Sequence, residues 1–366
     1  MHLYFHIPFC HRVCPYCSFY KHRPGKLANE AFVHSLLAQI DQQHPDWIGR
    51  PIQTVYWGGG TPTLLSGRLI TQLAEGIQAR FDLSGCREWT LEANPATFGK
   101  GKARSMIAAG VNRISLGVQS FQPDTLKTLG RDHSGEEARS AFQTLREVGF
   151  ENISVDLMFS IPGQTPESWK RDLDTAIALE PDHISAYNLT YEEDTDFLAR
   201  HISGELDADE DRDAILFENT IDRLAAAGYA QYEVSNYARP GFESQHNQAY
   251  WQGADYLGLG PGAVSTVEGR RWTTLPDTAT YIQSISERKD TKVNEETLSK
   301  DDRRLEAIAL RLRTEQGCPV DLIGLDDGLN RVEPLTKQGL IELKNGQVRL
   351  TRAGKSLADP IACELV

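Results

Sequence analysis

The sequence predicts an α/β protein, built on a parallel β-sheet with helical crossovers and followed by a smaller α+β module. Two observations predict this fold class. In the first 190 of the 366 residues, six short β-rich segments alternate with segments whose apolar residues recur at helical spacing. Beyond about residue 300, a helical pattern is followed by a hairpin with an Asn345-Gly346 turn. Both a barrel and an open doubly wound sheet fit the first part.

The expected strands of the first part are bounded by changes in hydrophobic period. The first expected helix carries Phe32, Leu36 and Ile40 on one face, and the second carries Ile70, Leu73 and Ile77. A third helix ends at Gly110, a residue type that favours the position after a helix. The six strands are expected at residues 3–9, 54–57, 89–92, 113–118, 153–158 and 183–189.

The pattern changes after Thr190. We expect a helix after the acidic segment 207–213, a strand at 232–237 and, because of its many glycines and aromatics, a loop at 246–262 that packs on the site. A polar stretch at 275–300 indicates a boundary. The helix containing Leu305 and Ile308, followed by the hairpin at 340–350, is typical of a winged-helix-like module.

Composition excludes some kinds of partner. The net charge of −13 argues against nucleic acid, whose phosphates attract basic surfaces. No run of about 18 apolar residues is present, so no membrane span is expected. Residues 1–6 lack the regions of a signal peptide and read as a strand, so a cytoplasmic location is expected.

Polar residues follow the expected strands, at their carboxyl ends. Cys10 follows the first strand, the segment 58–61 (Gly-Gly-Gly-Thr) the second and Glu92 ends the third. Gln119 ends the fourth strand, and Asp156 lies late in the fifth. Parallel α/β folds place ligands at this edge of the sheet, so we expect one site there.

Three cysteines carry the most specific motif, C-x3-C-x2-C, at Cys10, Cys14 and Cys17. Zinc held by these thiolates with His11 or a distant histidine is one interpretation. The other is a [4Fe–4S] cluster, which normally takes four thiolates. With three, one iron keeps an open position that suits the amino and carboxylate groups of S-adenosylmethionine (SAM). On this motif the chain resembles the radical-SAM superfamily.

The resemblance extends to the HemN/HemW group, which includes oxygen-independent coproporphyrinogen III oxidase. It is carried by residues 4–10, 59–63, 92–95, 111–121 and 156–165. It implies an incomplete (β/α)6 barrel at residues 1–200, a family-specific extension at 201–280 and a C-terminal winged-helix-like domain at 281–366. It also implies SAM contacts for Tyr4, Tyr16, Gly59, Gly60, Thr61, Glu92, Gln119, Arg131 and Asp156. From the residues alone, Arg131 could equally form a surface salt bridge with Asp132.

Three departures separate the chain from the oxidase. Phe19 stands where the oxidase pattern has a fourth cysteine, and only nine residues precede Cys10. Residues 246–251 read His-Asn-Gln-Ala-Tyr-Trp and resemble the H-N-x-x-Y-W motif of the haem-chaperone branch. The resemblance implies haem binding by His246, Tyr250 and Trp251. The residues alone also allow a hydrogen-bonded histidine with core aromatics.

The expected function is therefore binding of haem and its transfer to an acceptor haem protein. The expected cofactors are a [4Fe–4S] cluster and SAM, and whether SAM is cleaved stays open. The resemblance also leads us to expect an acceptor at the membrane, a peripheral membrane location and a homodimer. The alternatives are an oxidative decarboxylase of coproporphyrinogen III and a HemN-like radical-SAM methyltransferase.

Overall fold

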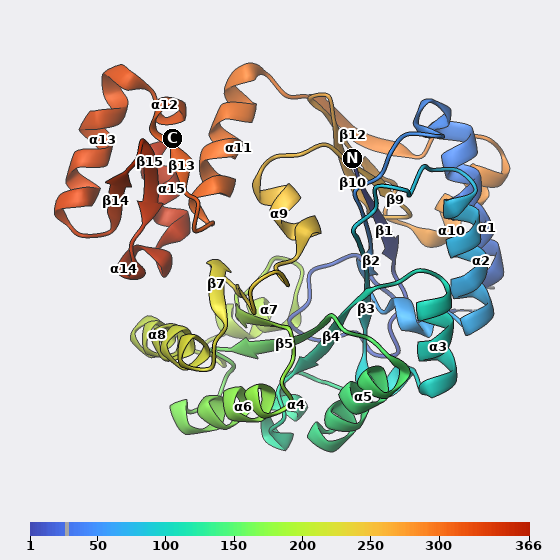
Figure 1. Ribbon diagram of the computed structural model, residues 1–366, viewed down its shortest axis with the longest axis horizontal. Helices are drawn as coiled ribbons and strands as arrows, with labels where there is room; N and C mark the ends of the chain where they lie inside the picture. The colour runs from blue at the N-terminus through green and yellow to red at the C-terminus, as the bar shows by residue number, and fades with distance from the viewer. Residues whose placement is uncertain (26–28) are drawn as a thin grey trace.

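The computed structural model describes residues 1–25 and 29–366. Within these residues twelve strands form one sheet, in the order β12-β11-β10-β9-β1-β2-β3-β4-β5-β6-β8-β7. The sheet curves without closing, because β12 and β7 are its edges (Figure 1). The incomplete barrel is confirmed. Its parallel strands are β9 (Tyr256–Leu259), β1 (His2–Ile7), β2 (Thr54–Gly59), β3 (Glu88–Ala93), β4 (Arg113–Gln119), β5 (Ile153–Phe159) and β6 (His183–Asn188).

Helices cover the outer face of this parallel sheet. Their apolar sides pack on strand residues such as Leu3, Val55 and Leu116, which are fully buried. Figure 1 shows them arranged around the outside of the curve. They are α1 (Asn29–Gln43), α2 (Gly67–Gln78), α3 (Lys100–Ala108), α4 (Pro123–Thr128), α5 (Gly135–Val148), α6 (Pro166–Ala178) and α8 (Glu210–Ala226), with short 3-10 turns η1 (Pro45–Trp47), η2 (Pro62–Leu64) and η3 (Pro95–Thr97). Helix α7 (Asp196–Ile202) lies apart from them, and its Phe197 packs beside Tyr16 of the cysteine loop.

The inner face of the sheet is polar. Successive side chains of a strand point to opposite faces, so the residues between the apolar ones share the inner face. Strand pairing places them side by side: His2 beside Thr54, Thr54 beside Glu88, and Asp156 beside Ser185. All five of these side chains are buried. The barrel therefore has a buried polar interior.

Two expectations after residue 190 are wrong. The segment 232–237 is not one strand, because the chain reverses at Val234–Ser235 to form the hairpin of β7 (Ala230–Glu233) and β8 (Asn236–Ala238). The segment 246–262 is not a loop, because it contains most of α9 (Gln245–Trp251) and all of β9. Ser244 begins α9 by accepting a hydrogen bond from the Asn247 amide (3.3 Å), and β9 extends the sheet beside β1.

The main sheet continues into the expected boundary region, 275–300. An antiparallel set of β10 (Val264–Val267), β11 (Arg270–Thr274) and β12 (Lys292–Thr297) follows β9, and α10 (Thr278–Ser286) packs on α1. A second hydrophobic core, which includes Ile308 and Leu312, starts with α11 (Lys300–Leu312). The division of the chain at residues 200 and 280 stays a prediction.

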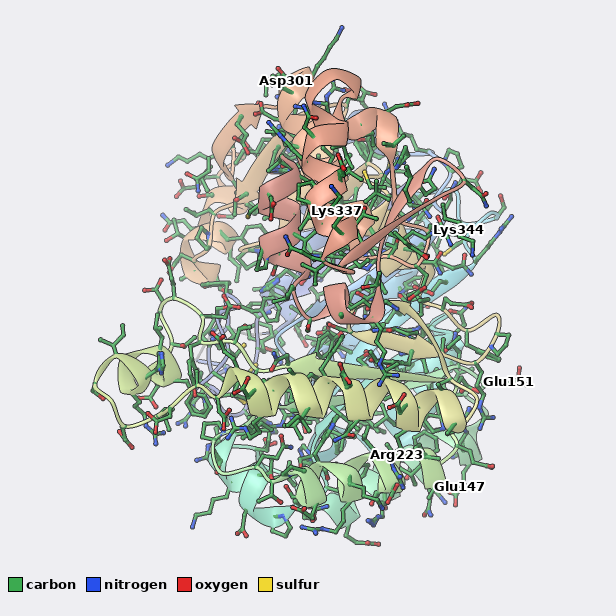
Figure 2. All side chains as sticks on the ribbon, turned by 90° about the vertical axis from the view of Figure 1, so that its left-hand side faces the viewer. Glu147, Glu151, Arg223, Asp301, Lys337 and Lys344 are labelled. Carbon is green, nitrogen blue, oxygen red and sulfur yellow. The ribbon has the colours of Figure 1, made fainter. Side chains whose placement is uncertain are left out.

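The C-terminal module has the expected helices and hairpin. Asn345 and Gly346 both have positive φ (52° and 73°), as a type I′ turn requires. Arg352 pairs with Asp222 of α8 (2.7 Å), and in Figure 2 the module lies above α8. Its further elements are β13 (Cys318–Pro319), α12 (Val320–Ile323), α13 (Leu325–Lys337), β14 (Ile341–Lys344), β15 (Gln347–Leu350), α14 (Arg352–Lys355) and α15 (Ala358–Leu365). No helix in the described residues is long and apolar enough to cross a bilayer.

Asp172 of α6 gives a test of the fold. Its buried carboxylate accepts hydrogen bonds from the Ser120 hydroxyl (2.6 Å), the Phe121 amide (2.7 Å) and the Gln122 side chain (3.1 Å). Asp172→Asn should lower the free energy of unfolding by about 2 kcal/mol, because one of the two accepting oxygens becomes an NH2 group that cannot accept a hydrogen bond from a buried donor. Urea denaturation measures this. Asp174→Asn, an exposed neighbour on the same helix, should cost less than about 1 kcal/mol. Equal losses in both variants would contradict the prediction.

Candidate functional site

A cavity of 460 Å³ opens at the carboxyl ends of β1 to β6. Its wall includes all three cysteines of the motif and residues from the ends of β2, β3, β4 and β5. Eight of the nine residues expected to contact SAM line it: Tyr16, Gly59, Gly60, Thr61, Glu92, Gln119, Arg131 and Asp156. The structure thus gathers them around one space, and their role in binding SAM stays a prediction. Tyr4, the ninth, lines a neighbouring cavity.

The cysteine loop is fixed next to β1. The Cys10 amide donates to the His22 carbonyl (3.0 Å), and the Cys17 amide donates to the Cys14 carbonyl (3.3 Å). The Thr61 hydroxyl lies 3.8 Å from the Cys10 sulfur. Burial raises the pKa of Cys10 to about 11 and also raises the pKa of Cys17. Soft thiols that are neutral when free become ligands by losing protons to a bound metal, so this donor set fits an iron–sulfur cluster.

His11, the nearby candidate for a fourth zinc ligand, lies outside this set. Its ring is more than half exposed and sits 3.9 Å from Asp132. In the part of the chain that the structure describes, no three or more His, Cys, Asp or Glu side chains are gathered as ligands of a single metal ion.

Glu92 of β3 is a buried carboxyl group in the wall of the first cavity. Its carboxyl group accepts hydrogen bonds from the Tyr56 hydroxyl (2.8 Å) and the Gly59 amide (3.1 Å). Burial, together with the charge of Asp156, raises the pKa of Glu92 to about 7, although those two hydrogen bonds act in the opposite direction. Glu92 is therefore protonated in part of the molecules near neutral pH and offers a ligand either a donor or an acceptor.

Asp156 is held by three serines from three strands. Its carboxylate accepts hydrogen bonds from Ser115 of β4 (2.6 Å), Ser154 of β5 (2.7 Å) and Ser185 of β6 (2.8 Å). These bonds satisfy a buried charge that would otherwise be costly. Asp156 thus fixes the spacing of the inner face as well as lining the cavity.

Gln119 and Arg131 also line the first cavity. Gln119 has a left-handed backbone conformation (φ 65°) at a bulge in β4, an unusual state for a residue with a side chain. Strain of this kind is concentrated at functional sites. The Arg131 guanidinium donates to the Gly117 carbonyl (2.7 Å) and lies 3.8 Å from the Cys14 sulfur. Its Nε is buried without a hydrogen-bond partner, so Arg131 faces the cavity and forms no ion pair with Asp132.

The glycine loop at the end of β2 is required by protein contacts. A Cβ at Gly59 would lie 2.3 Å from the His6 ring, and one at Gly60 would lie 2.7 Å from the Ile7 carbonyl. The loop amides are used within the protein, because Gly59 donates to Glu92, Gly60 to Ile7 and Thr61 to Phe9. The loop can therefore offer a ligand its carbonyl oxygens, which are suitable acceptors for an ammonium group.

A second cavity of 1010 Å³ lies between the inner face of the sheet, α9 and α11. Tyr4, His246 and Tyr250 line it. It shares wall residues with the first cavity, so the two spaces adjoin: Phe19, Tyr56, Gly59, Glu92 and Tyr187. Phe19, at the position of the oxidase's fourth cysteine, is 66% exposed and contributes no metal ligand.

His246 is the polar centre of the second cavity's buried wall. Its Nδ1 lies 2.6 Å from the Thr54 hydroxyl, which lies 2.8 Å from Nδ1 of His2. Its Nε2 is buried and has no hydrogen-bond partner. Burial, helped by the charges of His2 and Arg113, lowers the pKa of His246 to about 3, so the ring is neutral. Tyr56 stacks on this ring at 5.0 Å, and Tyr250 packs edge-on at 4.7 Å.

Glu88 holds the helix that carries His246. Its carboxylate accepts hydrogen bonds from the amides of Gln245 (2.7 Å) and His246 (3.0 Å), at the positive end of α9. It also accepts from the Ser244 hydroxyl (3.3 Å). Trp251, at the other end of α9, lies outside the walls of both cavities, and Arg313 lies 5.8 Å above its ring. The structure therefore places His246 and Tyr250 together and Trp251 apart.

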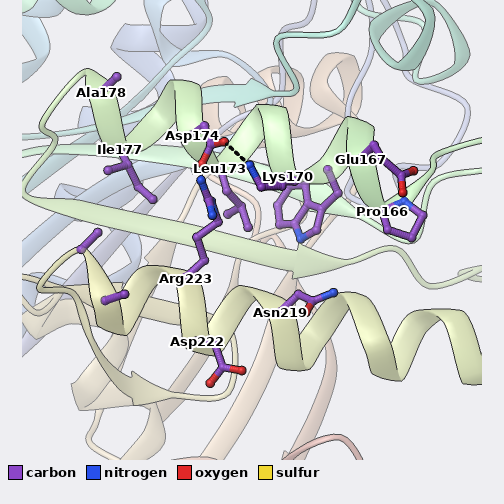
Figure 3. Close-up of a pocket in the computed structure, with 13 residues that line it drawn as sticks. Pro166, Glu167, Lys170, Leu173, Asp174, Ile177, Ala178, Asn219, Asp222 and Arg223 are labelled. Atoms are coloured by element: carbon purple, nitrogen blue, oxygen red, sulfur yellow. Dashed lines mark hydrogen bonds and ion pairs between the residues drawn. The ribbon is translucent and has the colours of Figure 1, made fainter.

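A third hollow of 690 Å³ lies on the outside of the sheet between α6 and α8 (Figure 3). Both of its basic side chains, Lys170 and Arg223, contact Asp174. It contains none of the expected site residues, so it is a groove between helices.

Sequence reasoning missed the residues inside the strands that support the site. Thr54 and Tyr56 of β2, and Glu88 of β3, hold His246 or Glu92. The signal was the alternation of polar and apolar residues along these strands. The expected site residues are those at the carboxyl ends of the strands, a set that does not include these inward-facing positions.

This fold and site define a radical-SAM protein. Residues 4–176 match the family model of the radical SAM superfamily, and residues 298–357 match the HemN C-terminal domain. The heme chaperone HemW of Lactococcus lactis is 37% identical to this chain, over 87% of it and 83% of the relative. The HemW of Escherichia coli is 42% identical, over 75% of this chain and 71% of the relative. The HemW of Mycobacterium tuberculosis is 35% identical, over 100% of this chain and 94% of the relative. The chain belongs to the HemW family.

A solved structure shares the whole architecture. Coproporphyrinogen III oxidase (HemN) from Escherichia coli, described as a radical SAM enzyme, superimposes with a TM-score of 0.85. The two are 25% identical, over 99% of this chain and 89% of the oxidase. The expected α/β fold with a HemN-type C-terminal domain is confirmed.

The raised pKa of Glu92 gives a test of the site. The folded protein holds an extra proton on Glu92 between about pH 4.5, the usual value, and about pH 7. The stabilisation that this proton gives is present below pH 4.5 and is lost as the pH rises through 7. The urea midpoint of the wild type should therefore fall relative to that of Glu92→Gln between pH 5 and pH 8. Glu147→Gln, at an exposed position, should show the wild-type pH dependence. A constant difference between Glu92→Gln and wild type would contradict the assignment.

Proposed function

We propose that this protein binds haem in the second cavity and transfers it to an acceptor haem protein. The observation that carries the proposal is the neutral, buried His246 with an unpartnered Nε2 in the wall of a large aromatic-lined cavity. A neutral imidazole is a common axial ligand of haem iron. The relatives named as heme chaperones support the same function.

In this proposal the first cavity holds a [4Fe–4S] cluster and SAM. Cys10, Cys14 and Cys17 would ligate the cluster. When bound, the cluster supplies an electron that SAM chemistry requires. The residues themselves bind and orient: Arg131 offers a cation for the SAM carboxylate, and Glu92 and Asp156 offer acceptors for hydroxyl groups. Because the two cavities share wall residues, cofactors bound in the first would lie next to a cargo bound in the second.

The hydrogen bonds of His246 leave Nε2 as the ring nitrogen without a partner. When Nδ1–H of His246 donates to the Thr54 hydroxyl and that hydroxyl donates to Nδ1 of His2, the Nε2 atom of His246 carries the free lone pair. We assign haem contact to His246 and Tyr250. Trp251, the third residue of the motif, lies outside the cavity wall and packs toward Arg313.

The place and the partners of transfer complete the proposal. The protein is cytoplasmic and forms a homodimer. Its acceptor is a haem protein at the membrane surface, where this protein binds peripherally. Support for these features comes from the family resemblance.

The cluster has a direct test. After anaerobic reconstitution with iron and sulfide, the wild type should hold about four irons and four sulfides per chain. Replacing Cys10, Cys14 or Cys17 with Ala should lower this content and abolish SAM binding measured by equilibrium dialysis. Cys86→Ala should retain both, since Cys86 lies apart from the cavity. Zinc in protein purified without oxygen would contradict the assignment.

Haem binding is tested by titration followed through the Soret band. His246→Ala should lose the wild-type spectrum of the bound iron, because its axial ligand is gone. Thr54→Val should weaken haem binding about tenfold, since a ligand loses the hydrogen bond that orients it. His34→Ala, at an exposed position of α1, is the control.

Two outcomes would count against this function. An unchanged spectrum in His246→Ala would remove that residue from the haem site. Turnover of coproporphyrinogen III by the wild type would favour the oxidase.

A further inference from the structure

We propose that Arg303 and Arg311 of α11 bind the carboxylate groups of a tetrapyrrole in the second cavity. This inference rests on the proposed function and deepens it. It gives the C-terminal module the role of a carboxylate-recognising wall.

One face of α11 forms part of the cavity wall. Arg303, Ala307 and Arg311 follow one another at four-residue spacing, which places them on one helix face. The residues of α11 that line the cavity are Arg303, Glu306, Ala307, Ala309, Leu310 and Arg311. Arg303 and Arg311 lie two turns apart, about 12 Å along the axis. They therefore present two cations along the same wall, on a helix that contacts α9.

Among the residues that the structure describes, these two cations have no carboxylate partner. Arg271, the third arginine of the cavity, is neutralised by a bidentate pair with Glu306 (2.5 and 2.7 Å). Arg303 and Arg311 form no ion pair in the part of the chain that the structure describes. The Arg303 Nε donates only to the Ser299 carbonyl (3.4 Å), and the Arg311 Nε is buried without a partner. The acids Asp255 and Glu268 also line the cavity, and both are exposed to solvent, as is Arg303, whereas Arg311 is partly buried.

The other walls of the cavity indicate what kind of molecule would carry these carboxylates. Tyr4, Tyr56, Tyr250 and Tyr256 contribute large aromatic surfaces. The volume of 1010 Å³ lies at the upper end of the range for small-molecule sites. Guanidinium groups bind carboxylates through two parallel hydrogen bonds. The cavity therefore suits a large planar aromatic molecule that carries carboxylates, such as a porphyrin with free propionates.

The test compares metal-free protoporphyrin IX with its dimethyl ester, using the reconstituted full-length protein and porphyrin fluorescence. The ester removes the carboxylate charges and keeps the ring. The wild type should bind the free acid more tightly than the ester. Arg303→Gln and Arg311→Gln should each weaken binding of the acid about tenfold and change ester binding less than twofold, so that the double variant loses the preference. Lys300→Gln removes a charge from α11 outside the cavity and should behave as wild type.

Two results would overturn the inference. If both variants keep the preference for the acid, the arginines do not contact the carboxylates. If binding of acid and ester weakens equally, the arginines act only in packing. His246→Ala separates this inference from the proposed function, because it should alter the haem spectrum and leave the preference for the metal-free acid unchanged. Arginine variants without effect, alongside an altered His246→Ala spectrum, would overturn this inference alone. Failure of the wild type to bind haem and both porphyrins would overturn both.

Discussion

The structure depends on hydrogen bonds to the polar side chains that the strands bury on the inner face of a half-closed barrel. Polar groups removed from water must find hydrogen-bond partners inside the protein, and a buried charge needs several. Asp156 meets this requirement through three serines on three neighbouring strands, and Glu88 meets it through the start of α9. The same bonds hold the strands in register and hold the site. Some residues, such as Asp156 and Ser115, therefore belong both to a cavity wall and to the scaffold.

This shared interior explains why the two cavities adjoin. Tyr56 donates to Glu92, and both side chains line the cysteine cavity and the larger one. Tyr56 also stacks on His246. A group bound on the cysteine side and a cargo bound on the α9 side would touch the same pair of side chains. The direct contacts of Tyr56 with Glu92 and with His246 are therefore sufficient to connect a group bound in one cavity with a group bound in the other.

The sequence was sufficient for the parts of the fold that repeat. Each strand from β1 to β6 has apolar outer residues and a helix after it, so its position followed from periodicity and its site residue from its carboxyl end. It was insufficient where a distant residue stabilises a short element. The seven-residue helix α9 is too short to be stable alone, and it depends on Glu88, which lies 157 positions before Gln245. The hairpin of β7 and β8 has a turn without the usual glycine or asparagine at Val234–Ser235. Thr54, Tyr56 and Glu88 were hidden for a different reason, since only the alternation within a strand reveals an inward-facing residue.

The hairpin that the sequence did not reveal also fixes the C-terminal module. The Val234 amide donates to the Arg313 carbonyl (3.0 Å), and the Glu315 amide donates to the Tyr232 carbonyl (3.1 Å), which joins the end of α11 to the edge of the sheet. Arg352 adds a second attachment on α8. Helix α11 is thus joined to the main sheet by backbone hydrogen bonds at its C-terminal end, and it also contacts α9, the helix that carries His246. The module, with a hydrophobic core of its own, is therefore positioned as a fixed wall of the larger cavity, and the width of that cavity is a property of the barrel.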